Sequence, residues 1–185
     1  LEDITLRALR ILCEVDLVLC EDTRVTRKIF DKHGITTPTM SYHAQSGEAK
    51  VEIILSAIAE GKSIALVTDA GTPGISDPGS LLISKIRETY RELKIVAIPG
   101  PSALTSALSI AGVPTHEFVF LGFMPHKKGR ETLFKEIVNS ERTIVFYEST
   151  HRIMKTLESL ATHLAGSKKK VTIVREITKI YEEVI

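Results

Sequence analysis

The segment from Thr68 to Gly79 has the composition of a ligand-binding loop. Its sequence, TDAGTPGISDPG, follows a β-branched run and combines glycines, which free the backbone, with prolines, which fix it. A ligand can approach such a backbone closely because few side chains stand in the way. The segment lacks both common phosphate-binding glycine spacings and holds no lysine, which argues against a dinucleotide or ATP. The alternative interpretation is a long structural turn.

A second segment of the same kind follows another apolar run. Residues 98–103 read IPGPSA, and Ser102 is suitably placed to cap a helix that begins there. In open α/β sheets, ligands bind where parallel strands end. Two shaped loops after two strands therefore predict one ligand cleft.

Four further segments place charged or polar side chains beside apolar runs. These are EDTR at 21–24, SYH at 41–43, YESTHR at 147–152 and REITK at 175–179. Each has a simple structural alternative as a helix cap or a solvated surface. No segment is specific by itself.

The elements that position these segments repeat in order as strand, loop and helix, which is typical of a parallel sheet. We predict strands at 15–19, 63–68, 94–98, 118–123, 143–147 and 171–174. Predicted helices end at His33 before Gly34, run from 48 to 60, from 102 to 111, and from 151 to 164. The pattern changes near 113–117, and we place a domain boundary there, giving domains 1–115 and 116–185.

Length and composition favour a folded, water-soluble chain. The 185 residues are 43% hydrophobic, and no apolar run approaches the roughly 20 residues of a membrane helix. We therefore expect a cytoplasmic location and no membrane partner. Cys13 and Cys20 are interpreted as small core residues. The net charge of +1 does not indicate a nucleic-acid-binding protein, so any such function depends on local clusters of basic residues.

Taken together, the segments resemble the ribosomal RNA 2′-O-methyltransferase family. The likeness covers nearly the whole chain, in order and in approximate spacing, and it rests on segments 21–24, 41–43, 69–73, 76–79, 98–103, 122–125 and 147–149. That family belongs to the tetrapyrrole methylase superfamily. The family pattern begins before Leu1 and continues past Ile185, so we expect the first strand and part of the second domain to be missing.

The resemblance implies an architecture and a cofactor. It implies a two-domain, class III α/β methyltransferase, with a mostly parallel sheet in the N-terminal half, a mixed sheet in the C-terminal half, and homodimers. It also implies that S-adenosylmethionine is folded into the cleft between the domains. The residues expected to hold it are Asp69, Ala70, Gly71, Thr72, Pro73, Pro99, Ser102, Ala103, Leu121, Gly122, Phe123, Tyr147 and Glu148.

Methyl transfer to a ribose hydroxyl requires alignment, exclusion of water and removal of a proton. Candidates for the proton acceptor are Glu21, Asp22, Glu148 and, if burial lowers its pKa, Lys179. Phosphate contacts of a ribosomal RNA or small-subunit partner are predicted for Lys127, Lys128 and Arg130, with Arg24, Arg27 and Arg152 as additions. The alternative for the three loop charges is a solubilising loop. We expect no metal.

Two other functions remain open from the sequence. The first keeps the fold but methylates a carbon of a tetrapyrrole, although segments 21–24 and 147–149 resemble the RNA branch. The second is a non-catalytic RNA-binding domain with a methylase fold. Cofactor binding discriminates, because a scaffold has no reason to keep two shaped cofactor loops.

Overall fold

A computed structural model describes residues 2–77 and 79–185. By packing, the chain forms two compact units, Leu1–Ser102 and Ala103–Ile185. This division falls before the boundary at 115/116 expected from the sequence, because the helix Ala103–Ile110 groups with the second unit. The domain limits 1–115 and 116–185 stay a prediction.

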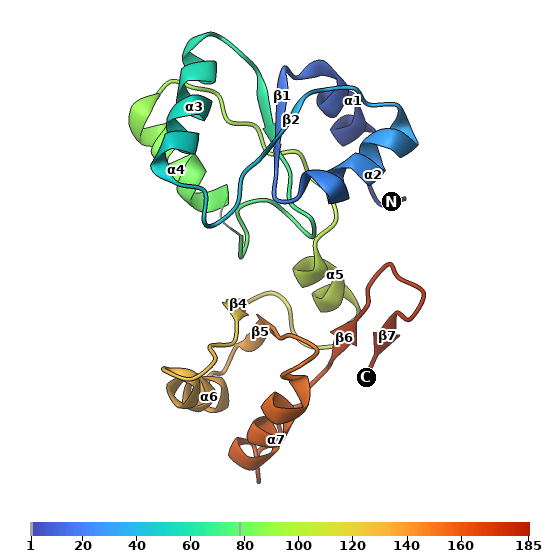
Figure 1. Cartoon of the computed structure of the whole chain (residues 1–185). Helices are drawn as coiled ribbons and strands as arrows, with labels where there is room; N and C mark the ends of the chain where they lie inside the picture. The colour runs from blue at the N-terminus through green and yellow to red at the C-terminus, as the bar shows by residue number, and fades with distance from the viewer. Residues whose placement is uncertain (1, 78) are drawn as a thin grey trace. The chain divides into compact units, whose positions relative to one another are not determined.

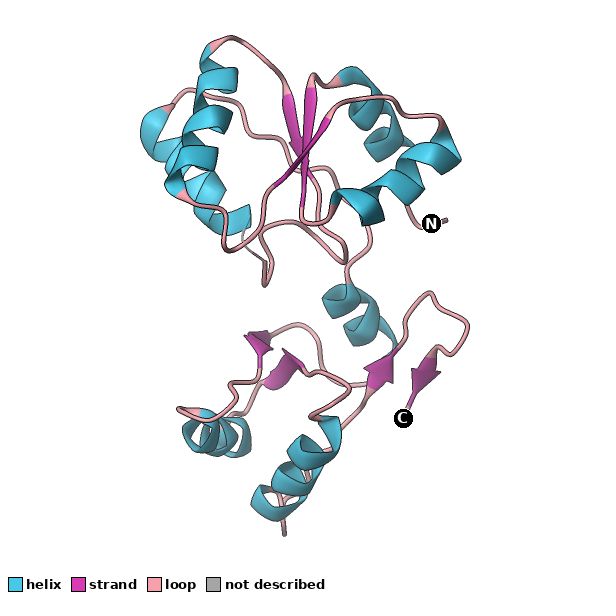
Figure 2. Ribbon diagram, viewed as in Figure 1, coloured by secondary structure: helices cyan, strands magenta, loops and turns pink. Residues whose placement is uncertain are grey.

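The first unit alternates helices with short strands (Figures 1 and 2). Its elements are α1 (Leu6–Glu14), β1 (Leu17–Cys20), α2 (Thr23–His33), β2 (Thr39–Ser41), α3 (Glu48–Ala59), β3 (Ile64–Leu66) and α4 (Gly79–Thr89). The strands form a parallel sheet in the order β2-β1-β3, with Val18 opposite both Thr39 and Ala65. This confirms the parallel sheet predicted for the N-terminal half.

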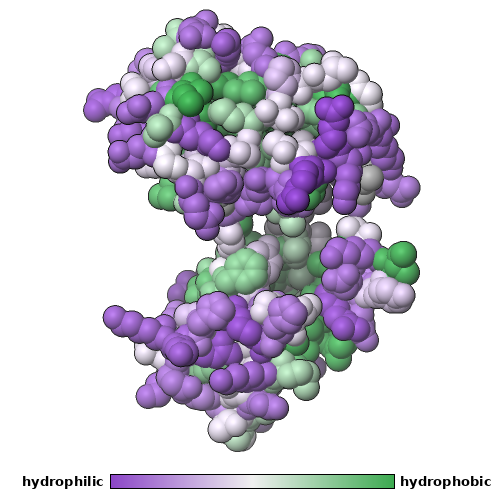
Figure 3. All heavy atoms as spheres, viewed as in Figure 1, coloured by the Kyte–Doolittle hydropathy of each residue, from purple (hydrophilic) through white to green (hydrophobic). Residues whose placement is uncertain are grey.

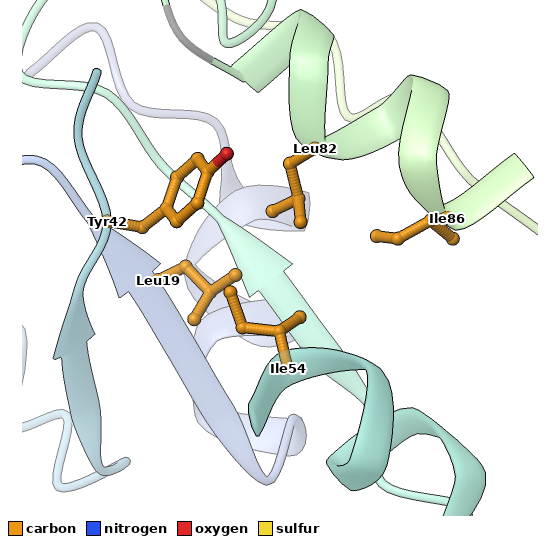
Figure 4. Close-up of a cluster of buried hydrophobic side chains, with 5 residues drawn as sticks. All are labelled: Leu19, Tyr42, Ile54, Leu82 and Ile86. Atoms are coloured by element: carbon orange, nitrogen blue, oxygen red, sulfur yellow. The ribbon is translucent and has the colours of Figure 1, made fainter. Parts of the chain in front are cut away.

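Helices cover both faces of this sheet, with α1 and α2 on one side and α3 and α4 on the other (Figure 1). Because successive residues of a strand point to opposite faces, the central strand β1 serves both layers. Leu19 packs with Tyr42, Ile54, Leu82 and Ile86 in one core cluster (Figure 4). Val18 packs with Leu12, Phe30 and Ile35 in the other. A continuous apolar β1 is therefore required.

Two helix ends of the first unit follow directly from their cap residues. Asp22 precedes α2, and its Oδ1 accepts a hydrogen bond from the Arg24 amide at 2.8 Å. Gly34 ends the same helix in the left-handed region, with φ of 66°, which glycine adopts without a Cβ penalty. The predicted end of this helix at His33 is confirmed.

The second unit contains α5 (Ala103–Ile110), β4 (Phe118–Phe123), α6 (Arg130–Asn139), β5 (Thr143–Tyr147), α7 (Ile153–His163), β6 (Val174–Arg175) and β7 (Glu183–Val184). β4 and β5 pair in parallel, while β6 and β7 pair antiparallel. Met124, Phe134, Ile137 and Leu160 form its core. The C-terminal half thus holds both strand directions, in two separate pairs.

Three expectations from the sequence are wrong. Residues 94–98 form no strand, and only Ile95 packs against the core while Val96 is exposed. The strand expected at 171–174 is reduced to Val174 and Arg175. A β-branched run becomes a strand only where a neighbouring strand supplies backbone hydrogen bonds, and composition does not reveal that partner. Cys13 is exposed, whereas Cys20 is buried as expected.

The surface seen in Figure 3 is largely hydrophilic, with scattered hydrophobic groups. No helix in the described part of the chain is both long and apolar enough to cross a membrane.

Candidate active-site loops

The predicted functional segments of the first unit gather at one edge of its sheet. β1, β2 and β3 are parallel, so their carboxyl ends lie together. Backbone hydrogen bonds from Tyr42 to Cys20 (2.8 Å) and from Val67 to Leu19 (2.9 Å) extend the pairing to this edge. Segments 21–24, 41–43 and 68–79 therefore leave the sheet side by side.

Glu21 joins two of these segments. Its Oε2 accepts hydrogen bonds from the Thr68 hydroxyl at 3.2 Å and from the Asp69 amide at 3.3 Å. The side chain of Glu21 is half-buried, whereas Asp69 reaches the surface. Partial burial, followed by the negative charge of Glu21, raises the pKa of Asp69. A predicted catalytic residue and a predicted cofactor residue are thus neighbours.

Asp22 has a different environment from Glu21. Its carboxylate caps α2 and also binds the Arg24 guanidinium, with Nη2 of Arg24 2.6 Å from Oδ2. The hydrogen bonds from the Arg24 side chain and amide lower the pKa of Asp22 to about 2. So acidic a carboxylate is a weak proton acceptor near neutral pH. Arg24 itself is 87% exposed, but its charge is already paired.

Segment 41–43 lies only partly at the surface. Tyr42 is 5% exposed and belongs to the core cluster in Figure 4, and burial raises its pKa. Ser41 accepts a hydrogen bond from Lys50 at 3.0 Å. Tyr42 therefore anchors the end of β2, and the sequence resemblance at this segment includes a packing residue.

Two glycines in the loop 68–79 have different physical roles. Gly71 has a φ of 75°, and nothing lies within 4 Å of the position its Cβ would take. A Cβ on Gly79 would lie 2.9 Å from both Asp77 Oδ1 and Leu66 Cδ2. Asp77 Oδ1 also accepts hydrogen bonds from the amides of Gly74 (2.8 Å) and Gly79 (2.7 Å). The loop is thus fixed around Asp77, whereas Gly71 borders open space.

The two predicted cofactor loops lie close together. The Thr72 hydroxyl donates to the Pro101 carbonyl at 3.5 Å, which is the long limit of a hydrogen bond. The hydroxyl of Thr5 is the same distance from the Pro99 carbonyl. The structure brings the loop 69–73 and segment 99–102 together, and the helix that follows starts at Ala103, one residue after the predicted cap Ser102.

The second unit places its own predicted residues at the carboxyl end of the β4–β5 pair. Phe120 is opposite Val145 and Phe123 is opposite Tyr147, so β4 carries one extra residue. Gly122, with φ of 64°, lies within this bulge. The ring of Tyr147 lies 5.2 Å from that of Phe123, which is 55% exposed. Leu121 packs against the core on the inner side.

Glu148 follows β5, and its side chain is only 2% exposed. Burial alone would raise the pKa of Glu148, but hydrogen bonds from Thr156 and the Ser149 amide, with the charges of Arg152 and Arg130, outweigh it and lower the pKa. Its hydrogen-bond donors and the two arginines together stabilise the carboxylate form. This environment disfavours Glu148 as a proton acceptor.

The predicted basic residues separate into exposed and internal groups. Lys127 and Lys128 are exposed. Arg130 and Arg152 have side chains 10% and 21% exposed, and both contact Glu148. Their guanidinium groups are used inside the unit, which speaks against the predicted phosphate contacts. Lys179 is 66% exposed and pairs with Glu176 at 3.2 Å, so the burial required for its predicted role is absent.

One important residue was missed from the sequence. Thr156 is fully buried in α7, and its hydroxyl donates to Glu148 at 2.6 Å while accepting from Arg130 at 2.5 Å. The available signal was its position four residues before the core residue Leu160, on the buried face of a helix. A hydroxyl on that face needs polar partners.

Among the described residues, no group of three or more His, Cys, Asp or Glu side chains is arranged to hold a metal ion.

Comparison with known proteins shows the family of the chain. The sequence profile of the family described as Tetrapyrrole (Corrin/Porphyrin) Methylases matches residues 1–185. The chain belongs to the tetrapyrrole methylase family. It is also 43% identical over 184 residues to a Thermotoga maritima protein named ribosomal RNA small subunit methyltransferase I, covering 99% of this chain and 81% of that protein.

Other relatives within the methylase family are longer or more distant. An Escherichia coli O157:H7 protein of the same name is 43% identical over 185 residues, which are 100% of this chain but 64% of that protein. The X-ray structure of a cobalamin biosynthetic enzyme, cobalt precorrin-4 methyltransferase, superposes with a TM-score of 0.68 at 20% identity. The superposed region comprises 100% of this chain and 79% of the chain in that structure. At this identity the structural likeness shows the methylase fold alone.

Proposed function

We propose that this protein transfers the methyl group of S-adenosylmethionine to a ribose 2′-hydroxyl of small-subunit ribosomal RNA. The observation that carries the proposal is the 43% identity, along nearly the whole chain, to relatives named ribosomal RNA small subunit methyltransferase I. The local geometry supports it, because the segments that carry the resemblance lie at strand ends, where α/β proteins bind ligands.

The first-unit loops fit the chemistry of the cofactor. A sulfonium is a cation, so its surroundings should offer carboxylate and carbonyl oxygens without a nearby ammonium group. The loop 68–79 has no lysine, and Asp69 and Glu21 lie next to each other at its start. The open space at Gly71 allows a ligand to approach the backbone. We assign cofactor binding to Asp69, Ala70, Gly71, Thr72, Pro73, Pro99, Ser102 and Ala103.

The second unit contributes residues of its own to the proposal. Leu121, Gly122, Phe123 and Tyr147 lie at the carboxyl end of the β4–β5 pair. An exposed aromatic ring such as Phe123 suits a flat heterocycle. For Glu148 we retain a place in this segment but assign it no direct contact with the cofactor, because its carboxylate is enclosed by its own unit.

Of the four catalytic candidates, Glu21 fits proton transfer best. It is half-buried, lies beside the cofactor loop and is free of an arginine partner in the described chain. Asp22 is held as a carboxylate by Arg24, and Glu148 by hydrogen bonds from Thr156 and the Ser149 amide together with Arg152 and Arg130. Lys179 is exposed. Alignment of the acceptor oxygen with the methyl group supplies the rest of the catalysis.

For the RNA partner, we assign phosphate contacts to Lys127 and Lys128. Both lysines are exposed and lie a few residues after β4. An RNA strand that reaches the carboxyl end of the β4–β5 pair therefore passes near them. Arg24 remains an addition that would first have to release Asp22. A cytoplasmic location and a homodimer belong to the same proposal.

Two experiments test this function. S-adenosylhomocysteine should raise the melting temperature of the protein, because a ligand that binds only the folded state stabilises it. Methyl transfer from labelled S-adenosylmethionine should then be detected on small ribosomal subunits or naked ribosomal RNA. Stabilisation by NAD or ATP without any effect of S-adenosylhomocysteine contradicts the proposal. Methylation of a uroporphyrinogen-type substrate in place of RNA would support the tetrapyrrole alternative.

A further inference from the structure

The second unit buries an ionic network in which two arginines share one carboxylate. Glu148 accepts hydrogen bonds from Thr156 (2.6 Å) and from the Ser149 amide (2.8 Å). Nη2 of Arg152 lies 2.7 Å from Glu148 Oε1, and Nη1 of Arg130 lies 3.4 Å from Oε2. We call Glu148, Arg130, Arg152 and Thr156 the Glu148 network.

The outer ends of this network hold the loop that follows β4. Arg152 Nη1 donates to the Met124 carbonyl at 2.9 Å, and Arg130 Nη1 donates to the Pro125 carbonyl at 3.1 Å. Both carbonyls lie just beyond Phe123, where the pairing of β4 with β5 ends. Glu148 itself lies just beyond Tyr147. The network therefore connects the two segments that follow β4 and β5.

Stability alone does not explain this arrangement. Burying charges costs desolvation energy, and apolar residues of similar volume often stabilise a core as well or better. Thr156 is fully buried, one helical turn before the core residue Leu160, yet this position holds a hydroxyl satisfied on both sides. A fully satisfied polar network instead fixes one geometry, because each member has directional partners.

We propose that the Glu148 network positions Phe123 and Tyr147 for cofactor binding, with Glu148, Arg130, Arg152 and Thr156 as positioning residues that do not touch the reacting atoms. The inference rests on the proposed function, because it assumes that these two aromatic residues contact S-adenosylmethionine. Tyr147 precedes Glu148, and Phe123 precedes Met124, so each ring adjoins a residue that the network holds. The two rings already lie 5.2 Å apart.

Thr156 provides the sharpest test, because valine matches its shape without the hydroxyl. Thr156→Val removes the hydroxyl that bridges Arg130 Nη2 and Glu148 Oε2, whereas Thr156→Ser retains it, and the direct contact of Arg130 Nη1 with Glu148 is present in both. Thr162→Val is the matched control, since this α7 hydroxyl is exposed and donates to the Glu158 carbonyl of its own helix at 3.0 Å. Affinity for S-adenosylhomocysteine is measured by calorimetry in the full chain, at a temperature where circular dichroism shows each variant folded.

We expect Thr156→Val to raise the Kd for S-adenosylhomocysteine about tenfold, and the KM for S-adenosylmethionine more than it lowers kcat. Thr156→Ser and Thr162→Val should stay within about twofold of the wild type. A folded Thr156→Val variant with unchanged Kd and only a lower melting temperature would show a purely structural network and overturn the inference.

Arg152→Lys is the second variant if Thr156→Val does not fold. Arg152 is the more exposed of the two arginines, and a lysine ammonium cannot reproduce its fork between Glu148 and the Met124 carbonyl. The same rise in Kd is expected, and an unchanged Kd again overturns the inference. If the wild type itself does not bind S-adenosylhomocysteine, the proposed function fails instead, so the two failures are distinguishable.

Discussion

The Glu21 carboxylate accepts a hydrogen bond from the backbone amide of Asp69, 3.3 Å away, and thereby joins the segments that follow β1 and β3. The two residues are 48 positions apart in the sequence. Their contact exists only because β1 and β3 are parallel neighbours whose carboxyl ends meet. It places the best proton-acceptor candidate next to the proposed cofactor loop.

Replacing Glu21 should therefore affect turnover more than cofactor binding. Glu21→Gln keeps an oxygen that can accept from Thr68 and Asp69 but removes the basic carboxylate. We expect kcat to fall by about 10²–10⁴, with S-adenosylhomocysteine affinity within about twofold of the wild type. Asp22→Asn is the control, because asparagine still caps α2 and Asp22 has little basicity to lose. Equal losses in both variants would refute the assignment.

Replacing Gly71 should weaken cofactor binding in addition to straining the backbone. Gly71→Val places a branched side chain where no protein atom lies within 4 Å, at a φ of 75°. Gly61→Val is the matched control, since Gly61 lies two residues beyond the end of α3, with a φ of 81° and equally open surroundings. In both variants the free energy of unfolding, measured with urea, should fall by about 1–3 kcal/mol. Only Gly71→Val should weaken S-adenosylhomocysteine binding, and equal affinity in the two variants means that the loop is structural.

The exposed lysines after β4 should control the salt dependence of RNA binding. In the Lys127→Ala, Lys128→Ala double variant, the slope of log affinity against log salt should become shallower by about 0.7–0.9 per lost contact. Cofactor affinity should not change. The Lys94→Ala, Lys135→Ala double variant removes two exposed lysines elsewhere and serves as the control. An unchanged slope would remove the charge-based argument for an RNA substrate.

Glu148 should make the free energy of unfolding depend on pH in the acid range. Its folded-state pKa lies below the ordinary value of 4.5, so its stabilising contribution is fully present above that value. The contribution is lost as the pH falls through the lowered pKa. Glu148→Gln, which leaves two arginines unpaired, should cost about 3 kcal/mol at neutral pH. The deficit relative to the wild type should shrink in acid, as measured by urea unfolding at a series of pH values, whereas a constant deficit contradicts this prediction.

The strands and helices with clear local signals could be predicted from sequence. Apolar runs predict β1, β4 and β5, and Gly34 predicts the end of α2. The strand expected at 94–98 failed because pairing depends on a distant partner. Residue type likewise indicated that segments 21–24 and 147–152 are special, but it did not show which side chain is buried. Arg130 and Arg152 look like phosphate ligands until their contacts with Glu148 are known.

The identity of the methylated atom tests the proposed function most directly. Small ribosomal subunits that lack the modification are incubated with the protein and S-adenosylmethionine carrying a labelled methyl group, and the RNA is then digested to nucleosides and analysed by mass spectrometry. We predict that the label is found on a 2′-O-methyl nucleoside at a single position and is lost with Glu21→Gln. Label on a base, or no label in RNA together with methylation of a tetrapyrrole, would contradict the proposed function.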